Sequence, residues 1–178
     1  MQLKTERLLI RELIPDDWQC MQKIAADFRK SKYAIYDIPL PTGNAKIIAL
    51  TEQFAETQLF YAVLLHDMMI GYICFHEDNG NYDLVFCFHS DYQGKGYAFE
   101  SCRAMMDYIS NERNIKTFTA GTALNNKPSC KLLERLGFIL QKTERLSFQK
   151  DAEGNDVTFE GGIFIKQEEN IPVSTPSE

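Results

Sequence analysis

A glycine-rich turn between an apolar run and a helical segment most constrains what this chain can fold into. The run Leu84–Phe88 has the composition of a buried strand, and apolar residues recur at helical spacing after the turn S-D-Y-Q-G-K-G-Y-A-F-E at 90–100. Gly94 and Gly96 let the backbone curl tightly and approach a ligand closely. The unpaired N–H groups of a first helical turn carry partial positive charge, and Lys95 adds a cation. The segment therefore predicts a site for a phosphate-bearing ligand.

The spacing within the turn excludes two common phosphate-binding motifs. A Walker loop requires Lys followed by Ser or Thr, whereas Lys95 is followed by Gly96. A dinucleotide fingerprint would place its last Gly or Ala one residue after Ala98. Read as Q-x-x-G-x-A, residues 93–98 resemble the pyrophosphate-binding motif of the GNAT acyltransferase superfamily, which binds acetyl-coenzyme A. Taken alone, this motif could also be a glycine turn that only joins a strand to a helix.

Three further segments, in the same order, extend this resemblance over residues 3–166. T-E-R-L-L-I-R at 5–11 resembles the first strand of the RimJ/RimL-type branch, and I-G-Y-I at 70–73 resembles its third strand. N-K-P-S at 126–129, followed by L-L-E-R-L-G-F at 132–138, resembles its N-x-x-S…L-E-K-L-G-F segment. The resemblance implies N-acetyl transfer from acetyl-coenzyme A to a primary amine, either a protein N-terminus or a small amine.

The implied fold is an α/β GNAT fold, with a mixed, mostly antiparallel sheet of about seven strands that splays between strands four and five. The predicted elements are a strand at 8–13, helices at 15–25 and 45–57, strands at 60–65, 69–75 and 82–88, a helix at 99–109, a strand at 116–123, a helix at 126–136 and a hairpin of 146–148 with 157–159. The strand at 116–123 should run parallel to the one at 82–88, because a helix connects them. We expect one domain at 1–166 and a disordered tail at 167–178.

Composition and charge exclude several functional classes. The 178 residues include 44% hydrophobic residues, enough for one sizeable core. The net charge of −6 and the lack of a basic run argue against nucleic acid as a partner. No apolar stretch is long enough to span a membrane, and the five cysteines lack metal-ligand spacing, so we expect no metal. The expectation is a cytoplasmic protein, monomeric or homodimeric.

By resemblance, the cofactor contacts come from the turn, from a strand end and from a helix start. The turn contributes Gln93, Gly94, Lys95, Gly96, Tyr97 and Ala98. Within 86–88, Phe88 is expected to offer a free backbone N–H to the thioester carbonyl. Asn126 is expected to contact the pantetheine arm, because its spacing to Ser129 is that of the family. Asn126 could instead only cap the helix, and Asn125 could take either part.

Ser129 is the catalytic acid that the resemblance implies. Many superfamily members protonate the leaving thiolate with a tyrosine, but this chain has Leu133 at that place. RimL-like members use the Ser of N-x-x-S instead. Ser129 could equally be an ordinary serine in the first turn of a helix, where its hydroxyl bonds to the backbone. A protein that binds acyl-coenzyme A with little turnover, acting as a sensor or partner, also remains open.

Asp83 is the expected catalytic base. It lies where relatives carry a glutamate on the fourth strand, and its shorter side chain would reach the amine through a water molecule. Asp83 could equally be an exposed carboxylate on a strand, with no catalytic role. Glu77, His76 and His89 are weaker candidates for the base.

Overall fold

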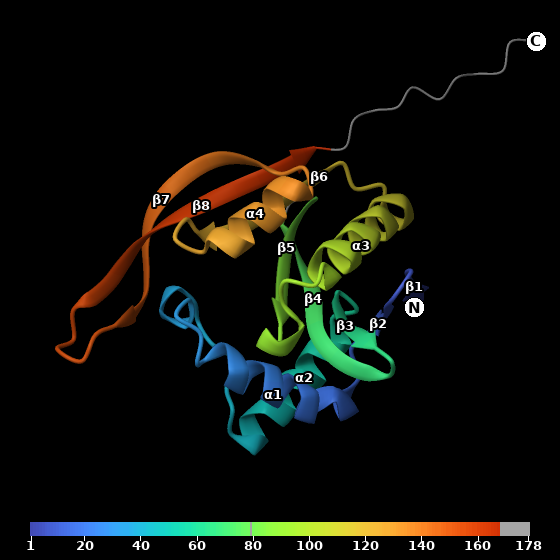
Figure 1. Cartoon of the computed structure of the whole chain (residues 1–178), viewed down its shortest axis with the longest axis horizontal. Coiled ribbons are helices and arrows are strands. Elements are labelled where there is room, and N and C mark those ends of the chain that lie inside the picture. The colour runs from blue at the N-terminus through green and yellow to red at the C-terminus, as the bar shows by residue number, and fades with distance from the viewer. Residues whose placement is uncertain (79, 168–178) are drawn as a thin grey trace, which may run out of the picture.

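The chain folds around one sheet that helices cover on both faces (Figure 1). The computed structural model describes residues 1–78 and 80–167, and these form eight strands in the order β1-β2-β3-β4-β5-β6-β8-β7. The strands are β1 (Gln2–Lys4), β2 (Leu9–Glu12), β3 (Phe60–Leu65), β4 (Met68–Asp78), β5 (Asn81–Phe88), β6 (Thr117–Ala123), β7 (Ile139–Lys150) and β8 (Asp156–Gln167). The helices are α1 (Trp18–Phe28), α2 (Asn44–Glu56), α3 (Tyr97–Arg113) and α4 (Lys127–Arg135), with short 3-10 turns η1 (Pro15–Asp17), η2 (Ala34–Tyr36) and η3 (Ser90–Tyr92).

Every neighbouring strand pair is antiparallel except β5 and β6, which run parallel. The connection between these two strands is α3, a helix of 17 residues. Parallel strands need such a crossover, because a tight turn cannot return the chain in the same direction. The mixed sheet with its single parallel pair confirms the expected fold class.

The N-terminal part of the sheet has one strand more than the sequence predicts. The strand expected over 8–13 is β2, and the additional strand β1 precedes it across a turn at Thr5. The Thr5 N–H donates to the Leu8 carbonyl (2.9 Å), and the Thr5 hydroxyl accepts from the Leu8 N–H (3.0 Å). β1 therefore folds back along β2, with Gln2 opposite Arg11. The sheet has eight strands rather than about seven, and the strands expected as fourth and fifth are β5 and β6.

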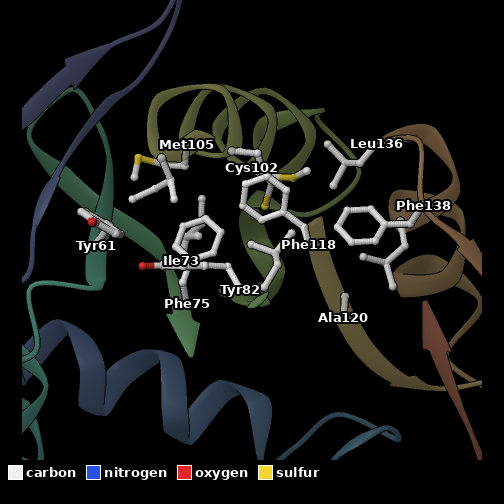
Figure 2. Close-up of a cluster of buried hydrophobic side chains, with 14 of the residues drawn as sticks. Tyr61, Ile73, Phe75, Tyr82, Cys102, Met105, Phe118, Ala120, Leu136 and Phe138 are labelled. Carbon is white, nitrogen blue, oxygen red and sulfur yellow. The ribbon is translucent and has the colours of Figure 1, made fainter. Parts of the chain in front are cut away.

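The larger hydrophobic core lies between the sheet and α3. Figure 2 shows Cys102 and Met105 of α3 facing Ile73, Phe75 and Phe118 of the sheet. All five side chains are fully or almost fully buried. Burial of one large apolar side chain contributes about 1.5–3 kcal/mol. This core fixes α3, and with it the turn that precedes the helix, against the sheet.

A second core lies on the opposite face, where α1 and α2 cover the sheet. Met21 and Ile24 of α1 and Ile47 of α2 pack with Tyr72 and Cys74 of β4. Successive β4 side chains thus alternate between the two cores. Because both faces are covered, the central strands read as unbroken apolar runs rather than as an alternating pattern.

Two further features of the described part of the chain bear on the expectations. None of its helices combines the length and the apolar composition that crossing a membrane requires. The disordered tail was expected to begin at residue 167, but Gln167 is the last residue of β8. The rest of the expected tail, 168–178, lies outside the described residues.

Candidate active site

β5 and β6 diverge into a wedge shortly after they begin to pair. Their register joins only Tyr82 to Phe118 and Asp83 to Thr119. β5 continues along β4 as far as Phe88, while β6 pairs with β8 on its other side. The remaining length of β5 therefore faces an open angle in the sheet, where backbone groups are left without a strand partner.

The backbone N–H of Phe88 points into this wedge. The His89 N–H donates to the carbonyl of Ile70 on the neighbouring strand β4 (3.0 Å). Successive residues of a strand direct their N–H groups to opposite sides, so the Phe88 and Phe86 N–H groups point away from β4. Phe88 has the geometry expected for a donor to a thioester carbonyl, and Phe86 shares it.

The turn before α3 has the conformation that its two glycines allow. Gly94 (φ +72°) and Gly96 (φ +84°) both adopt left-handed backbone conformations. Gly96 is the N-cap of α3, and as a glycine it has no side chain to cap the helix. The first N–H groups of α3 are thus left for a ligand, and the helix dipole favours an anion there. A pyrophosphate group fits this cradle in charge and in hydrogen-bonding capacity.

Two side chains of the turn form hydrogen bonds to backbone carbonyls of the protein. The Gln93 Nε2 donates to the Phe88 carbonyl (2.8 Å), which connects the turn to the end of β5. The Lys95 Nζ donates to the Asp91 carbonyl (2.7 Å), and Lys95 is absent from the residues that line the adjacent cavity. The turn therefore presents its backbone, more than its side chains, to a ligand.

Arg7 and Glu100 fasten this turn to the N-terminal segment, and we call this pair the Arg7–Glu100 clamp. The Glu100 carboxylate accepts hydrogen bonds from the Thr5 hydroxyl (2.6 Å), the Arg7 N–H (2.9 Å) and the Arg7 Nε (2.7 Å). The Arg7 Nη1 donates to the Lys95 carbonyl (3.0 Å), and its guanidinium lies 4.6 Å from the centre of the Tyr97 ring. Burial acts to raise the Glu100 pKa, but the bonds from Thr5 and Arg7 lower it overall.

A cavity of about 890 Å³ joins the turn to the wedge and extends beyond it. Its wall is formed by the end of α1 and the following segment, by β5, by the starts of α3 and α4, and by the β7–β8 hairpin. Its lining includes Phe86, Phe88, Gln93, Gly94, Gly96, Tyr97, Ala98, Asn126 and Ser129. Most of the expected cofactor residues, which come from separate segments of the chain, thus meet at one cavity.

The start of α4 places Asn126 and Ser129 together. The Asn126 Oδ1 accepts a hydrogen bond from the Ser129 N–H (3.3 Å), so Asn126 caps the helix. Both residues also line the cavity, whereas Asn125 lines a smaller hollow against the β7–β8 hairpin. Leu133 is 1% exposed and belongs to the core, and its hydrocarbon side chain has no acidic proton to donate.

Asp83 lies at the closed base of the wedge. It accepts a hydrogen bond from the Thr119 hydroxyl across the last β5–β6 pair (2.9 Å), and it is absent from the cavity lining. Burial raises the Asp83 pKa, while Thr119 and His76 act in the opposite direction. A catalytic role for Asp83 would therefore depend on a water molecule between its carboxylate and the cavity.

The weaker candidates for the base are also outside the cavity or engaged elsewhere. The Glu77 carboxylate accepts a hydrogen bond from the Tyr82 hydroxyl (2.8 Å), and neither Glu77 nor His76 lines the cavity. The His89 Nδ1 accepts from the Asp91 N–H (3.3 Å), and His89 caps the 3-10 turn η3.

Three carboxylates that do line the cavity were not singled out from the sequence: Asp27, Asp37 and Glu144. Asp27 accepts two hydrogen bonds from Ser90, through its N–H (2.7 Å) and its hydroxyl (2.8 Å). Glu144 pairs with Lys142. Asp37 accepts one bond, from the Ile38 N–H (2.7 Å), and burial raises its pKa. No local motif marks these residues, because chain segments distant from the turn bring them to the site.

Comparison with known proteins assigns this arrangement to a family. Residues 7–139 match the model of the acetyltransferase (GNAT) domain. The chain belongs to the GNAT family. It is 30% identical over 145 residues to the uncharacterized N-acetyltransferase YnaD of Bacillus subtilis strain 168. These residues make up 77% of this chain and 82% of that protein.

Solved structures of GNAT proteins share the fold. A GNAT-family acetyltransferase from Bacillus anthracis superposes with a TM-score of 0.77 at 23% identity, over 94% of this chain and 98% of that one. RimL, a ribosomal L7/L12 alpha-N-protein acetyltransferase, superposes with a TM-score of 0.80 at 13% identity, over 94% of each chain. The fold expected from the four sequence segments is thus that of the family.

Proposed function

We propose that this protein transfers the acetyl group of acetyl-coenzyme A to a primary amine by direct attack of the amine nitrogen on the thioester carbon. One observation carries the proposal: the phosphate cradle of α3 and Phe88, whose N–H points away from β4, line the same cavity. The two features match the two ends of an acyl-coenzyme A, its pyrophosphate and its thioester. Acetyl-coenzyme A supplies an activated acetyl group when bound.

The backbone would carry most of the binding and the polarisation. The N–H groups from Gly94 to Ala98 would hold the pyrophosphate, and Asn126 would contact the pantetheine arm while it caps α4. The Phe88 N–H would hydrogen-bond the carbonyl oxygen as negative charge develops on it. Loss of one such donor from the oxyanion hole of a serine protease costs about a hundred- to a thousandfold in kcat.

Two protons have to move in the reaction. The acceptor ammonium must first lose one proton to become a nucleophilic amine. As the carbon–sulfur bond breaks, the nitrogen loses a second proton, which balances the proton that the departing thiolate gains. We assign protonation of the thiolate to Ser129, which lines the cavity. We assign deprotonation of the ammonium to Asp83 through a bridging water, in keeping with its raised pKa and its place at the base of the wedge. The net products are an N-acetylated amine, free coenzyme A and one proton.

The acceptor would be a protein N-terminus or a small amine, and the protein would act in the cytoplasm. The five free cysteines agree with a reducing compartment. Calorimetric titration with coenzyme A and an assay of thiol release over an amine panel test the proposal. Binding with amine-dependent thiol release is expected. Binding without release from any amine would instead indicate an acyl-coenzyme A sensor, and no binding would refute the whole assignment.

A further inference from the structure

We call the part of the cavity that lies between the segment after α1 and the β7–β8 hairpin the acceptor pocket. Its walls are Tyr33, Tyr36 and Asp37 from the segment after α1, and Phe148 and Phe159 from the β7–β8 hairpin. Figure 1 shows this segment approaching the hairpin on the side of the molecule away from α3. The phosphate cradle at the start of α3 and the acceptor pocket are therefore at different ends of the cavity.

The acceptor pocket has a roof made by contacts between its two walls. The side-chain amide of Gln149 on β7 donates to the carbonyl of Ala34 (2.6 Å) and to the carbonyl of Asp37 (2.7 Å). The ring of Tyr36 lies 5.2 Å from that of Phe159, centre to centre. These contacts join the segment after α1 to the β7–β8 hairpin. An extended polypeptide that entered between the two walls would have to separate them.

The lining of the pocket combines aromatic rings with one available carboxylate, that of the exposed residue Asp37. Phe148 is 47% exposed although it packs on Phe159 at 5.5 Å, so its ring presents apolar surface to the pocket. Of the three carboxylates in the lining, Asp27 is held by Ser90 and Glu144 by Lys142.

Asp37 keeps one carboxylate oxygen available among the contacts of the described residues. One of its oxygens accepts from Ile38, and the other has no partner there. The Asp37 charge also acts to raise the pKa of Cys87, a residue of β5 that lines the same cavity next to Phe88. Asp37 and the strand that would hold the thioester thus line one cavity.

This chemistry fits a short molecule with an ammonium group and an apolar body. The carboxylate attracts the ammonium, and aromatic faces stabilise both a nearby cation and an apolar group. The cavity volume lies within the range of small-molecule sites, and the pantetheine arm would share it. The remaining space suits a compact acceptor.

We propose that the acceptor is a small primary amine with an aromatic ring, that Asp37 binds its ammonium group, and that the Gln149 roof excludes polypeptide N-termini. This proposal rests on the proposed function and selects between its two acceptor classes. Asp37 contacts the substrate, whereas Gln149 acts by holding the two walls together.

The first experiment compares acceptors with the full chain and acetyl-coenzyme A. The probes are phenethylamine, putrescine, which lacks an apolar ring, and a short peptide with a free N-terminal serine. We expect kcat/KM for phenethylamine to exceed that for the peptide by at least about tenfold, the discrimination that an apolar pocket can provide. A peptide that is acetylated as well as or better than phenethylamine would overturn the proposal and leave the proposed acetyl transfer standing.

Variants separate the two residues. Asp37→Asn should raise KM for phenethylamine by about tenfold, the weight of a hydrogen bond to a charged group, with the coenzyme A dissociation constant changed by less than about twofold. Asp107→Asn, an exposed aspartate on α3, is its control. Gln149→Ala should lower the preference for phenethylamine over the peptide, and Gln141→Ala, exposed on the same strand, should not. An unchanged KM in Asp37→Asn would refute its role.

A binding measurement distinguishes failure of this inference from failure of the proposed function. Calorimetric titration of phenethylamine into the protein with free coenzyme A needs no turnover. Binding that weakens in Asp37→Asn supports the acceptor pocket even where no thiol is released. Absence of phenethylamine binding in the parent protein overturns it, whatever the peptide does.

Discussion

Arg7→Ala tests whether the Arg7–Glu100 clamp shapes the phosphate cradle. The substitution removes the guanidinium that bonds the Glu100 carboxylate, the Lys95 carbonyl and the face of Tyr97. It leaves the backbone N–H of Arg7 and the Thr5 hydroxyl on Glu100, so the carboxylate keeps two donors. The perturbation is therefore local to the turn and does not create a buried charge without partners.

The size of the effect follows from these contacts. The Arg7 side chain is 41% exposed, and exposed ion pairs contribute about 0.2–1 kcal/mol because water screens them. A cation over an aromatic ring at an exposed site adds about 0.5–1 kcal/mol. With the bond to Lys95, about 1–2 kcal/mol holds the turn in its binding conformation. Loss of that restraint lowers the fraction of binding-competent protein, so the coenzyme A dissociation constant should rise by about tenfold.

Titration calorimetry and urea denaturation of the parent and of Arg7→Ala measure this effect. Arg103→Ala, which removes an exposed arginine from α3, is the matched control and should bind coenzyme A as the parent does. Glu100→Ala and the double variant complete a cycle, in which a coupling of at least about 0.5 kcal/mol in binding is expected. A folded Arg7→Ala protein with an affinity within about twofold of the parent would show that the clamp does not shape the cradle.

Three further substitutions test the assigned roles. Gly96→Val places a branched side chain at φ +84° and should weaken coenzyme A binding far more than it lowers the free energy of unfolding, as calorimetry and denaturation would show; unchanged affinity would remove the cradle assignment. Ser129→Ala should lower kcat by up to about a hundredfold with the cofactor dissociation constant nearly unchanged, and an unaltered kcat would leave Ser129 as a helix-start serine only. Asp83→Asn should lower activity by about ten- to a thousandfold near neutral pH, with partial recovery as rising pH deprotonates the amine, and matching pH–rate profiles would exclude Asp83 as the base. Because burial raises the Asp83 pKa, the parent loses stability as pH rises from the ordinary aspartate pKa through the raised one, so Asp83→Asn should be no less stable at neutral pH.

The sequence alone determined the features that depend on residues close to one another along the chain. Gly94 and Gly96 are the residues that a left-handed turn requires, and both adopt that conformation. Apolar residues at helical spacing after the turn specify α3, and a helix between two strands specifies the parallel pairing of β5 with β6. These are short-range rules, in which residue type and spacing fix the backbone.

Tertiary structure decided what each polar side chain of the site contacts. Arg7 meets Glu100 across 93 residues of sequence, Gln93 turns to the Phe88 carbonyl, and Asp37 reaches the cavity from a loop without a motif. A long side chain has many rotamers that its own segment does not distinguish. The partners that select among them arrive only when α3 packs on the sheet and the β7–β8 hairpin closes over the segment after α1. A sequence motif therefore locates the cradle, but the packed fold determines which side chains face the acceptor.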